Sequence, residues 1–103
     1  MTVGVLGQAD LAASTNTLVY TAITQAAVGI NVLNRTASGV TVRVAIGTIS
    51  GSSPTNSNYI EYDALVPANA VLERTGIVLG AGQKVVVYAA TTGVTASVYG
   101  VET

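Results

Sequence analysis

The stretch Tyr59–Ala90, YIEYDALVPANAVLERTGIVLGAGQKVVVYAA, decides the fold class of this chain. It contains three short runs rich in Val, Ile, Leu and Tyr, residue types that favour strands. Pro67-Ala68-Asn69 separates the first two runs, and Gly80-Ala81-Gly82-Gln83 separates the last two. Turn residues between β-forming runs predict antiparallel strands joined by tight connections.

The same alternation of strand-forming runs and turn residues extends over most of the chain. Residues 28–34 and 40–46 alternate apolar with smaller or polar residues, which predicts strands with one face on a core. The predicted strands cover 17–23, 28–34, 40–46, 59–65, 70–79, 84–90 and 94–102. About seven short strands, with turn signals roughly every 8–12 residues, predict an all-β fold. We expect an antiparallel β-sandwich of jelly-roll or immunoglobulin-like type.

The N-terminal segment, residues 1–16, shows no clean periodicity, and two alternatives are open for it. Its apolar residues pair as a short strand, or the segment is an arm that lies on a neighbouring subunit. We assign residues 1–16 as an N-terminal arm contacting a neighbouring subunit and residues 17–103 as a single β-sandwich domain. The longest polar stretch, Gly47–Asn58, predicts an exposed loop.

The composition restricts the classes of function. Half of the 103 residues are hydrophobic and 9% are charged, against roughly 25% charged in an average soluble protein. The net charge of −1 provides no basic surface for nucleic acid, so we expect no direct nucleic-acid binding. No run approaches the ~18 apolar residues that indicate a membrane span, and no signal peptide is recognisable, so we expect an unprocessed chain outside the membrane.

Residues suited to catalysis or metal binding are few. The chain has no His and no Cys, so the usual general base, thiol nucleophile and soft metal ligands are missing. Glu61 and Asp63 lie two apart on a predicted strand, so they share a face as a hard-cation site, as half of a glycosidase-like acid pair, or as a solvated strand edge. We favour the strand edge. Gly80–Lys84 precedes a strand, which indicates a hairpin turn and not a phosphate loop. We expect no enzyme activity, no catalytic residues, no metal and no cofactor.

The charged and aromatic residues of the opening stretch are the candidates for an interface or a receptor contact. A tyrosine cluster on a strand is a sugar platform or an interface anchor, or its rings are partly buried at the core margin. Adjacent residues in a strand point to opposite faces, so the side chains of Glu73 and Arg74 do not pair with each other. The candidate residues are Tyr59, Glu61, Tyr62, Asp63, Glu73 and Arg74.

A set of strand and turn motifs runs along most of the chain. The motifs are NR at 34–35, VRVAI at 42–46, YIEYD at 59–63, PAN at 67–69, ERTGIVL at 73–79, AGQKVVVYA at 81–89 and VYG at 98–100. Together they resemble a group of small virion structural proteins of tailed bacteriophages, especially phages of marine bacteria and cyanobacteria. The motifs contain strand and turn positions and no catalytic signature.

The resemblance implies a non-enzymatic virion protein that is synthesised in the host cytoplasm. We expect a capsid decoration (cement) protein that stabilises neighbouring capsid subunits. Its partners would be the major capsid protein or other virion proteins and further copies of itself, as a trimer. Sheet edges and the N-terminal arm would add strands or apolar contacts to neighbours. The alternative is a tail, neck or fibre accessory protein that binds a receptor or carbohydrate through Tyr59, Tyr62, Glu61 and Asp63.

Overall fold

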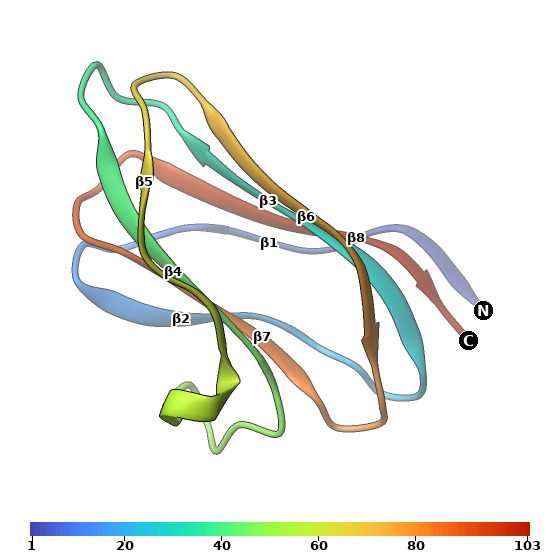
Figure 1. Cartoon of the computed structure of the whole chain (residues 1–103). Helices are drawn as coiled ribbons and strands as arrows, with labels where there is room; N and C mark the ends of the chain where they lie inside the picture. The colour runs from blue at the N-terminus through green and yellow to red at the C-terminus, as the bar shows by residue number, and fades with distance from the viewer.

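Two four-stranded antiparallel sheets pack face to face in the computed structural model, which describes residues 1–103 (Figure 1). One sheet has the order β1 (Thr2–Asp10), β8 (Val94–Glu102), β3 (Ala26–Asn34), β6 (Val71–Leu79). The other has the order β2 (Thr15–Thr21), β7 (Lys84–Ala89), β4 (Val40–Gly47), β5 (Tyr59–Val66). A single 3-10 turn, Asn56–Asn58, precedes β5. None of the chain's helical structure has the length and apolar character needed to cross a membrane.

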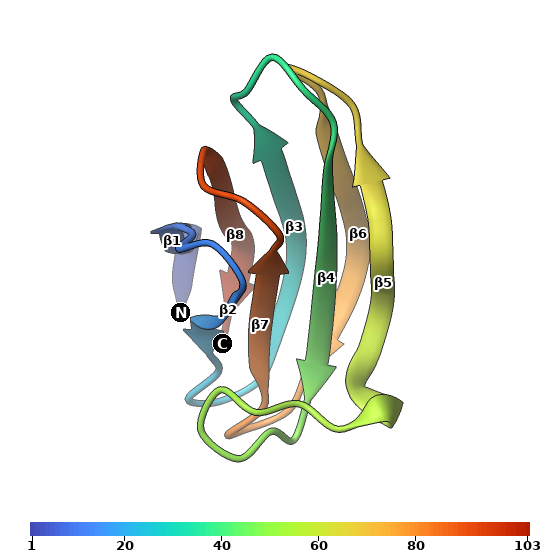
Figure 2. The ribbon, with the colours of Figure 1, turned by 90° about the vertical axis from the view of Figure 1, so that its left-hand side faces the viewer.

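Figure 2 shows the two sheets one in front of the other, and consecutive strands mostly belong to different sheets. Every connection crosses from one sheet to the other except that between β4 and β5, which are neighbours in the same sheet. Strands close in sequence therefore face each other across the core, and strands that pair are mostly distant in sequence. The predicted hairpin at Gly80–Lys84 is wrong, because this turn joins β6 and β7, which belong to different sheets and do not pair.

The prediction of an all-β antiparallel sandwich is confirmed, and the strand count is corrected from about seven to eight. The additional strand is β1, which pairs with β8 from Thr2 to Asp10. The sequence leaves two alternatives for residues 1–16, a strand or a separate arm. Residues 2–10 form the strand, as part of the sandwich. The period-two pattern of β1 is hidden because glycine residues interrupt it. Glycine is needed at position 7, since a Cβ there would lie 2.2 Å from the carbonyl oxygen of Val19. Contact with a neighbouring subunit stays a prediction.

The core is built from aliphatic side chains that the two sheets turn toward each other. The predicted inward faces of β3 and β4 are buried, with exposures of 4% or less for Val28, Ile30, Val32, Val40, Val42 and Val44. Each fully buried side chain of this size contributes about 1.5–3 kcal/mol. The opposing sheets therefore hold together mainly through close-packed valines, leucines and isoleucines.

Asn34 at the end of β3 is the one buried polar residue, and it ties the two sheets together. Its Nδ2 donates to the carbonyl oxygens of Ser38 at 2.8 Å, Val66 at 3.0 Å and Pro67 at 3.2 Å. Its Oδ1 accepts hydrogen bonds from the backbone N–H and the hydroxyl of Thr36. β3 and β5 belong to different sheets. The Asn34 side chain therefore provides hydrogen bonds to backbone carbonyl groups at the point where the chain passes from one sheet to the other.

All four edge strands are bulged, whereas the central ladders β3–β8 and β4–β7 run without interruption. The unmatched residues are Leu6 in β1, Val19 in β2, Ile60 and Tyr62–Asp63 in β5, and Thr75–Gly76 in β6. Bulges twist an edge strand and interrupt its row of free backbone groups, which disfavours pairing with another chain.

These bulges separate side chains that a regular strand would place on one face, and one prediction is wrong for this reason. Leu18 is 41% exposed and Tyr20 is 8% exposed, with the bulge at Val19 between them. Glu61 and Asp63 likewise do not share a face, because the Tyr62–Asp63 bulge separates them and Asp63 has φ +50°. A bulge inserts one residue and so reverses the period-two pattern beyond it.

Candidate interaction surfaces

Arg43 is the centre of a cluster on the outer face of the β2-β7-β4-β5 sheet. Its guanidinium carbon lies 4.2 Å from the ring centroid of Tyr62 and 4.7 Å from that of Tyr88. Its Nε donates to Oδ1 of Asp63 at 2.7 Å. That hydrogen bond raises the pKa of Arg43 above its usual value, partial desolvation opposes the shift, and the charge of Asp63 adds to it. The cation is thus stacked between two rings and paired with one carboxylate.

Tyr59 and Tyr62 form the walls of a hollow beside this cluster. Their ring centroids are 5.0 Å apart and the rings meet edge to face at 83°. The hollow has a volume of about 490 Å³, and Asn56 from the 3-10 turn completes its lining. Two phenol rings and an amide therefore surround an open space on the surface.

The loop between β4 and β5 covers the neighbouring part of the same outer face. Ile49 of this loop is 5% exposed and packs with Ala45 and Val86, which are 0% and 1% exposed, and Tyr59 packs against the group. The loop 47–58 is mostly exposed, as predicted, but Ile49 departs from that expectation. The chain thus supplies its own cover for apolar residues on this face.

Glu61 lies apart from the tyrosine hollow and bridges the two sheets. Nε of Arg74 in β6 donates to Oε2 of Glu61 at 2.7 Å, and the Glu61 side chain is 16% exposed. β5 and β6 are edge strands of different sheets, so the ion pair closes one open side of the sandwich. A charge that points inward on an edge strand also opposes strand addition.

Glu73 lies on the outer face of the other sheet. Its Oε2 accepts a hydrogen bond from the hydroxyl of Tyr99 at 3.1 Å. Desolvation, that hydrogen bond and the negative charge of Glu73 together raise the pKa of Tyr99 above its ordinary value. The six predicted contact residues therefore occupy three places. Tyr62 and Asp63 contact Arg43, with Tyr59 against Tyr62; Glu61 pairs with Arg74 at the sheet edges; and Glu73 lies beside Tyr99.

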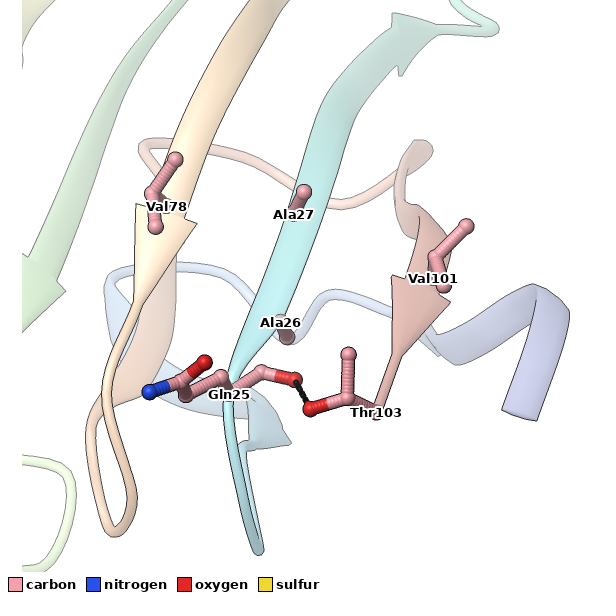
Figure 3. A pocket seen from close by; sticks show the side chains of 6 residues that line it. All are labelled: Gln25, Ala26, Ala27, Val78, Val101 and Thr103. Atoms are coloured by element: carbon pink, nitrogen blue, oxygen red, sulfur yellow. Dashed lines mark hydrogen bonds between the residues drawn. The ribbon is translucent and has the colours of Figure 1, made fainter. Parts of the chain in front are cut away.

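An apolar row crosses the outer face of the β1-β8-β3-β6 sheet. Val3, Val101, Ala27 and Val78 are cross-strand partners in one line over all four strands, and we call them the valine row. Val3 is 69% exposed and Val78 is 75% exposed. Figure 3 shows Val78, Ala27 and Val101 projecting side by side from β6, β3 and β8.

Small residues on β3 leave two hollows along this face. A hollow of about 170 Å³ lies between Ala27, Val78 and Val101, and one of about 270 Å³ lies over Ala27 and Gly29 beside Tyr99. No charged side chain lines either hollow. The face thus combines a ridge of valines with shallow depressions.

Sequence reasoning missed the valine row and the role of Arg43. The row joins residues 3, 27, 78 and 101, which become neighbours only through the strand order. The outward position of Arg43 was recognisable from the strict alternation of its strand. Its partners were not, because they lie in β5 and β7 and become neighbours only through strand pairing.

No group of three or more His, Cys, Asp or Glu side chains is placed to hold a metal ion. Comparisons with protein-family models, curated proteins and solved structures found no match.

Proposed function

We propose that the chain is a non-enzymatic structural protein of a bacteriophage virion, specifically a capsid decoration protein that stabilises neighbouring capsid subunits. The motifs between Asn34 and Gly100 that resemble small phage virion proteins support this class. The low charge content supports it too, because subunits that bury much of their surface among neighbours are depleted in charged residues. The protein would be made in the host cytoplasm and act in the particle, with the major capsid protein or other virion proteins as partners.

We further propose that the sandwich is a jelly roll. The orders β1-β8-β3-β6 and β2-β7-β4-β5 support this assignment, since nearly every connection crosses between the sheets. An immunoglobulin-like sandwich instead pairs several sequential strands within one sheet. Jelly rolls of eight strands are common in viral capsid and lectin domains.

The single observation that carries the assembly proposal is the uncovered valine row. Val3 and Val78 face solvent in the isolated chain, while the comparable residues Ala45 and Val86 on the opposite face are buried under Ile49. A contiguous exposed apolar patch marks an interaction site. The row lacks charged side chains, and its valine ridge lies beside shallow hollows that the ridge of another copy can enter, so the occupant we propose is a second copy of this chain.

The size of this face is sufficient for a stable interface. The molecule measures 38 × 27 × 19 Å, and its broad face is comparable with the ~800 Å² that each partner buries in a standard interface. The bulges on all four edge strands and the inward-pointing pair Glu61–Arg74 disfavour strand addition. Assembly therefore proceeds by packing of faces and not by the strand addition at sheet edges that the sequence suggests. Packing of this face on a second copy closes with two subunits, so the contact we propose forms a dimer, and the trimer expected from the sequence would need a second, different contact.

Sedimentation equilibrium of the purified chain and two matched variants tests the self-association. Val78→Glu places a charge in the row and should shift the protein to monomer, because burying an unpaired carboxylate is strongly unfavourable. Leu65→Glu changes an exposed residue of similar character, 65% exposed on β5, and should leave the oligomer intact. A monomeric wild-type protein, or equal dissociation by both variants, would contradict the role of the row.

Copy number in purified phage particles tests the place in the virion. A decoration protein should be present in a fixed ratio to the major capsid protein. A small fixed number of copies would instead assign the chain to the tail, neck or a fibre, the alternative we retain. Absence from particles would refute the virion proposal even if the valine row mediates self-association.

A further inference from the structure

The surface hollow that Tyr59, Tyr62 and Asn56 line is suited to bind a small ligand. Its volume of about 490 Å³ lies within the ~300–1,000 Å³ typical of ligand sites, which combine aromatic walls with a few placed polar groups. Tyr62 is 58% exposed, so its ring is available at the surface.

The Tyr62 ring is held in place by a charged cluster. Arg43 stacks on the Tyr62 ring at 4.2 Å and is itself fixed by Tyr88 and by the hydrogen bond to Asp63. A ring supported in this way loses little conformational freedom when a ligand binds, which favours affinity.

The Tyr59 wall is held by apolar packing. Tyr59 packs on the buried group of Ala45, Ile49 and Val86. Its edge-to-face contact with Tyr62 fixes the angle between the two walls at 83°. Both walls of the hollow are therefore set by the folded chain before any ligand arrives.

Asn56 presents its amide from an anchored turn. Thr55 N–H donates to Oδ1 of Asn58 at 2.8 Å, and Nδ2 of Asn58 donates to the carbonyl oxygen of Ile46 at 3.2 Å, which ties the turn to β4. The hydroxyls of Tyr20 and Tyr99 are used within the chain, whereas those of Tyr59 and Tyr62 and the Asn56 amide have no intramolecular partner. The hollow thus offers two phenols and one amide to a ligand.

We infer that this hollow binds a neutral saccharide. The apolar C–H face of a sugar ring packs on an aromatic ring, and its hydroxyls match the phenol and amide groups. An anionic ligand fits less well, because the charge of Arg43 is already paired with Asp63. Tyrosines beside a loop rich in Ser, Gly and Asn, here GTISGSSPTNSN at 47–58, are also the composition of binding loops that recognise polar surfaces. Glu61 is not part of the site, since it is turned to Arg74.

The site is independent of the proposed assembly surface. The hollow lies on the β2-β7-β4-β5 sheet and the valine row on the other, so a protein assembled through the row still exposes the hollow. Failure of one proposal therefore leaves the other standing, and their tests use different variants.

Titration of the full chain with neutral trisaccharides of glucose, galactose, mannose and N-acetylglucosamine, followed by NMR, tests the inference. At least one should shift the amide signals of residues 56–62, and Tyr62→Ala should weaken binding by about tenfold through loss of the stacked ring. Tyr62→Phe keeps the ring and should retain most of the affinity. Leu18→Ala, at a 41% exposed position on the same sheet outside the hollow, should bind as the wild type does.

Asn56→Ala provides a second variant at an exposed position, should Tyr62→Ala unfold. It should weaken binding without lowering the melting temperature. The inference is overturned if no neutral trisaccharide binds, or if both Tyr62→Ala and Asn56→Ala bind with wild-type affinity.

Discussion

The two outer faces of the sandwich differ in whether their apolar residues are covered. On the β2-β7-β4-β5 sheet, the loop residue Ile49 buries Ala45 and Val86 almost completely. On the β1-β8-β3-β6 sheet, Val3 and Val78 remain 69% and 75% exposed. The same chain therefore covers one apolar face with its own loop and leaves the other without cover. Apolar residues on the first face should stabilise the monomer, and those on the second should stabilise an assembly.

Removal of the cover over the first face should have the largest effect on monomer stability. Ile49→Ala deletes a side chain that is 5% exposed, and such large-to-small changes in buried sites cost about 2–5 kcal/mol. The free energy of unfolding, measured by denaturant titration at low protein concentration, should fall by that amount. Leu65→Ala serves as the control at a 65% exposed position and should change the free energy by no more than ~0.5 kcal/mol. Equal costs for both variants would mean that Ile49 is not a structural cover.

Disturbance of the strand that carries the uncovered face should have an effect of similar size on stability. Gly100 has φ +148°, and a Cβ there would lie 2.1 Å from the carbonyl oxygen of Ala27 in the valine row. Gly100→Ala should cost roughly 1–3 kcal/mol from backbone strain, and the clash adds to this cost because β8 and β3 must move apart to relieve it; the variant should also weaken self-association by displacing Ala27. Gly51→Ala, where φ is +59° and no atom lies within 4 Å of the added Cβ, is the control that adds strain without a clash. If the two variants are equally stable and associate equally well, the contact between β8 and β3 is not limiting.

The smallest expected effect concerns pH and the hydrogen bond between Tyr99 and Glu73. Folding raises the pKa of Tyr99, so its contribution to stability is complete below the ordinary tyrosine pKa and is lost as pH rises through the folded value. Phenolate absorbance during alkaline titration should include a contribution from Tyr99 that appears at higher pH than in the unfolded chain. Tyr99→Phe should remove that late transition, and Glu73→Gln should move it to lower pH. A late transition that persists in Tyr99→Phe would assign it to another residue.

Strand positions could be predicted from sequence because period-two alternation is a local property. All seven predicted strands occur within about two residues of their observed bounds, and the strict alternation of β4 placed Val40, Val42 and Val44 in the core. For β1 the sequence leaves the strand as one of two alternatives, because Gly4 and Gly7 replace the side chains that would have revealed its period.

The candidate surfaces could be predicted only in part. Tyr59 and Tyr62 were recognised as a pair, but Arg43 and Asn56 were not, because strand pairing and the 3-10 turn bring them there. The bulge at Tyr62–Asp63 separated Glu61 from Asp63, which no pattern of residue types at this spacing would reveal. Pairing between distant strands therefore determines the surfaces, whereas the local pattern determines the strands.

The pairing of the first strand with the last has a consequence for folding kinetics. Thr2 lies opposite Glu102, so the β1-β8-β3-β6 sheet closes only by contacts between the two ends of the chain. Folds dominated by such long-range pairs have high contact order and fold slowly. The valine row takes members from positions 3, 27, 78 and 101, so it cannot form before residue 101 has been synthesised. Association through this surface is thus delayed until β8 has docked, which separates folding from oligomerisation in time.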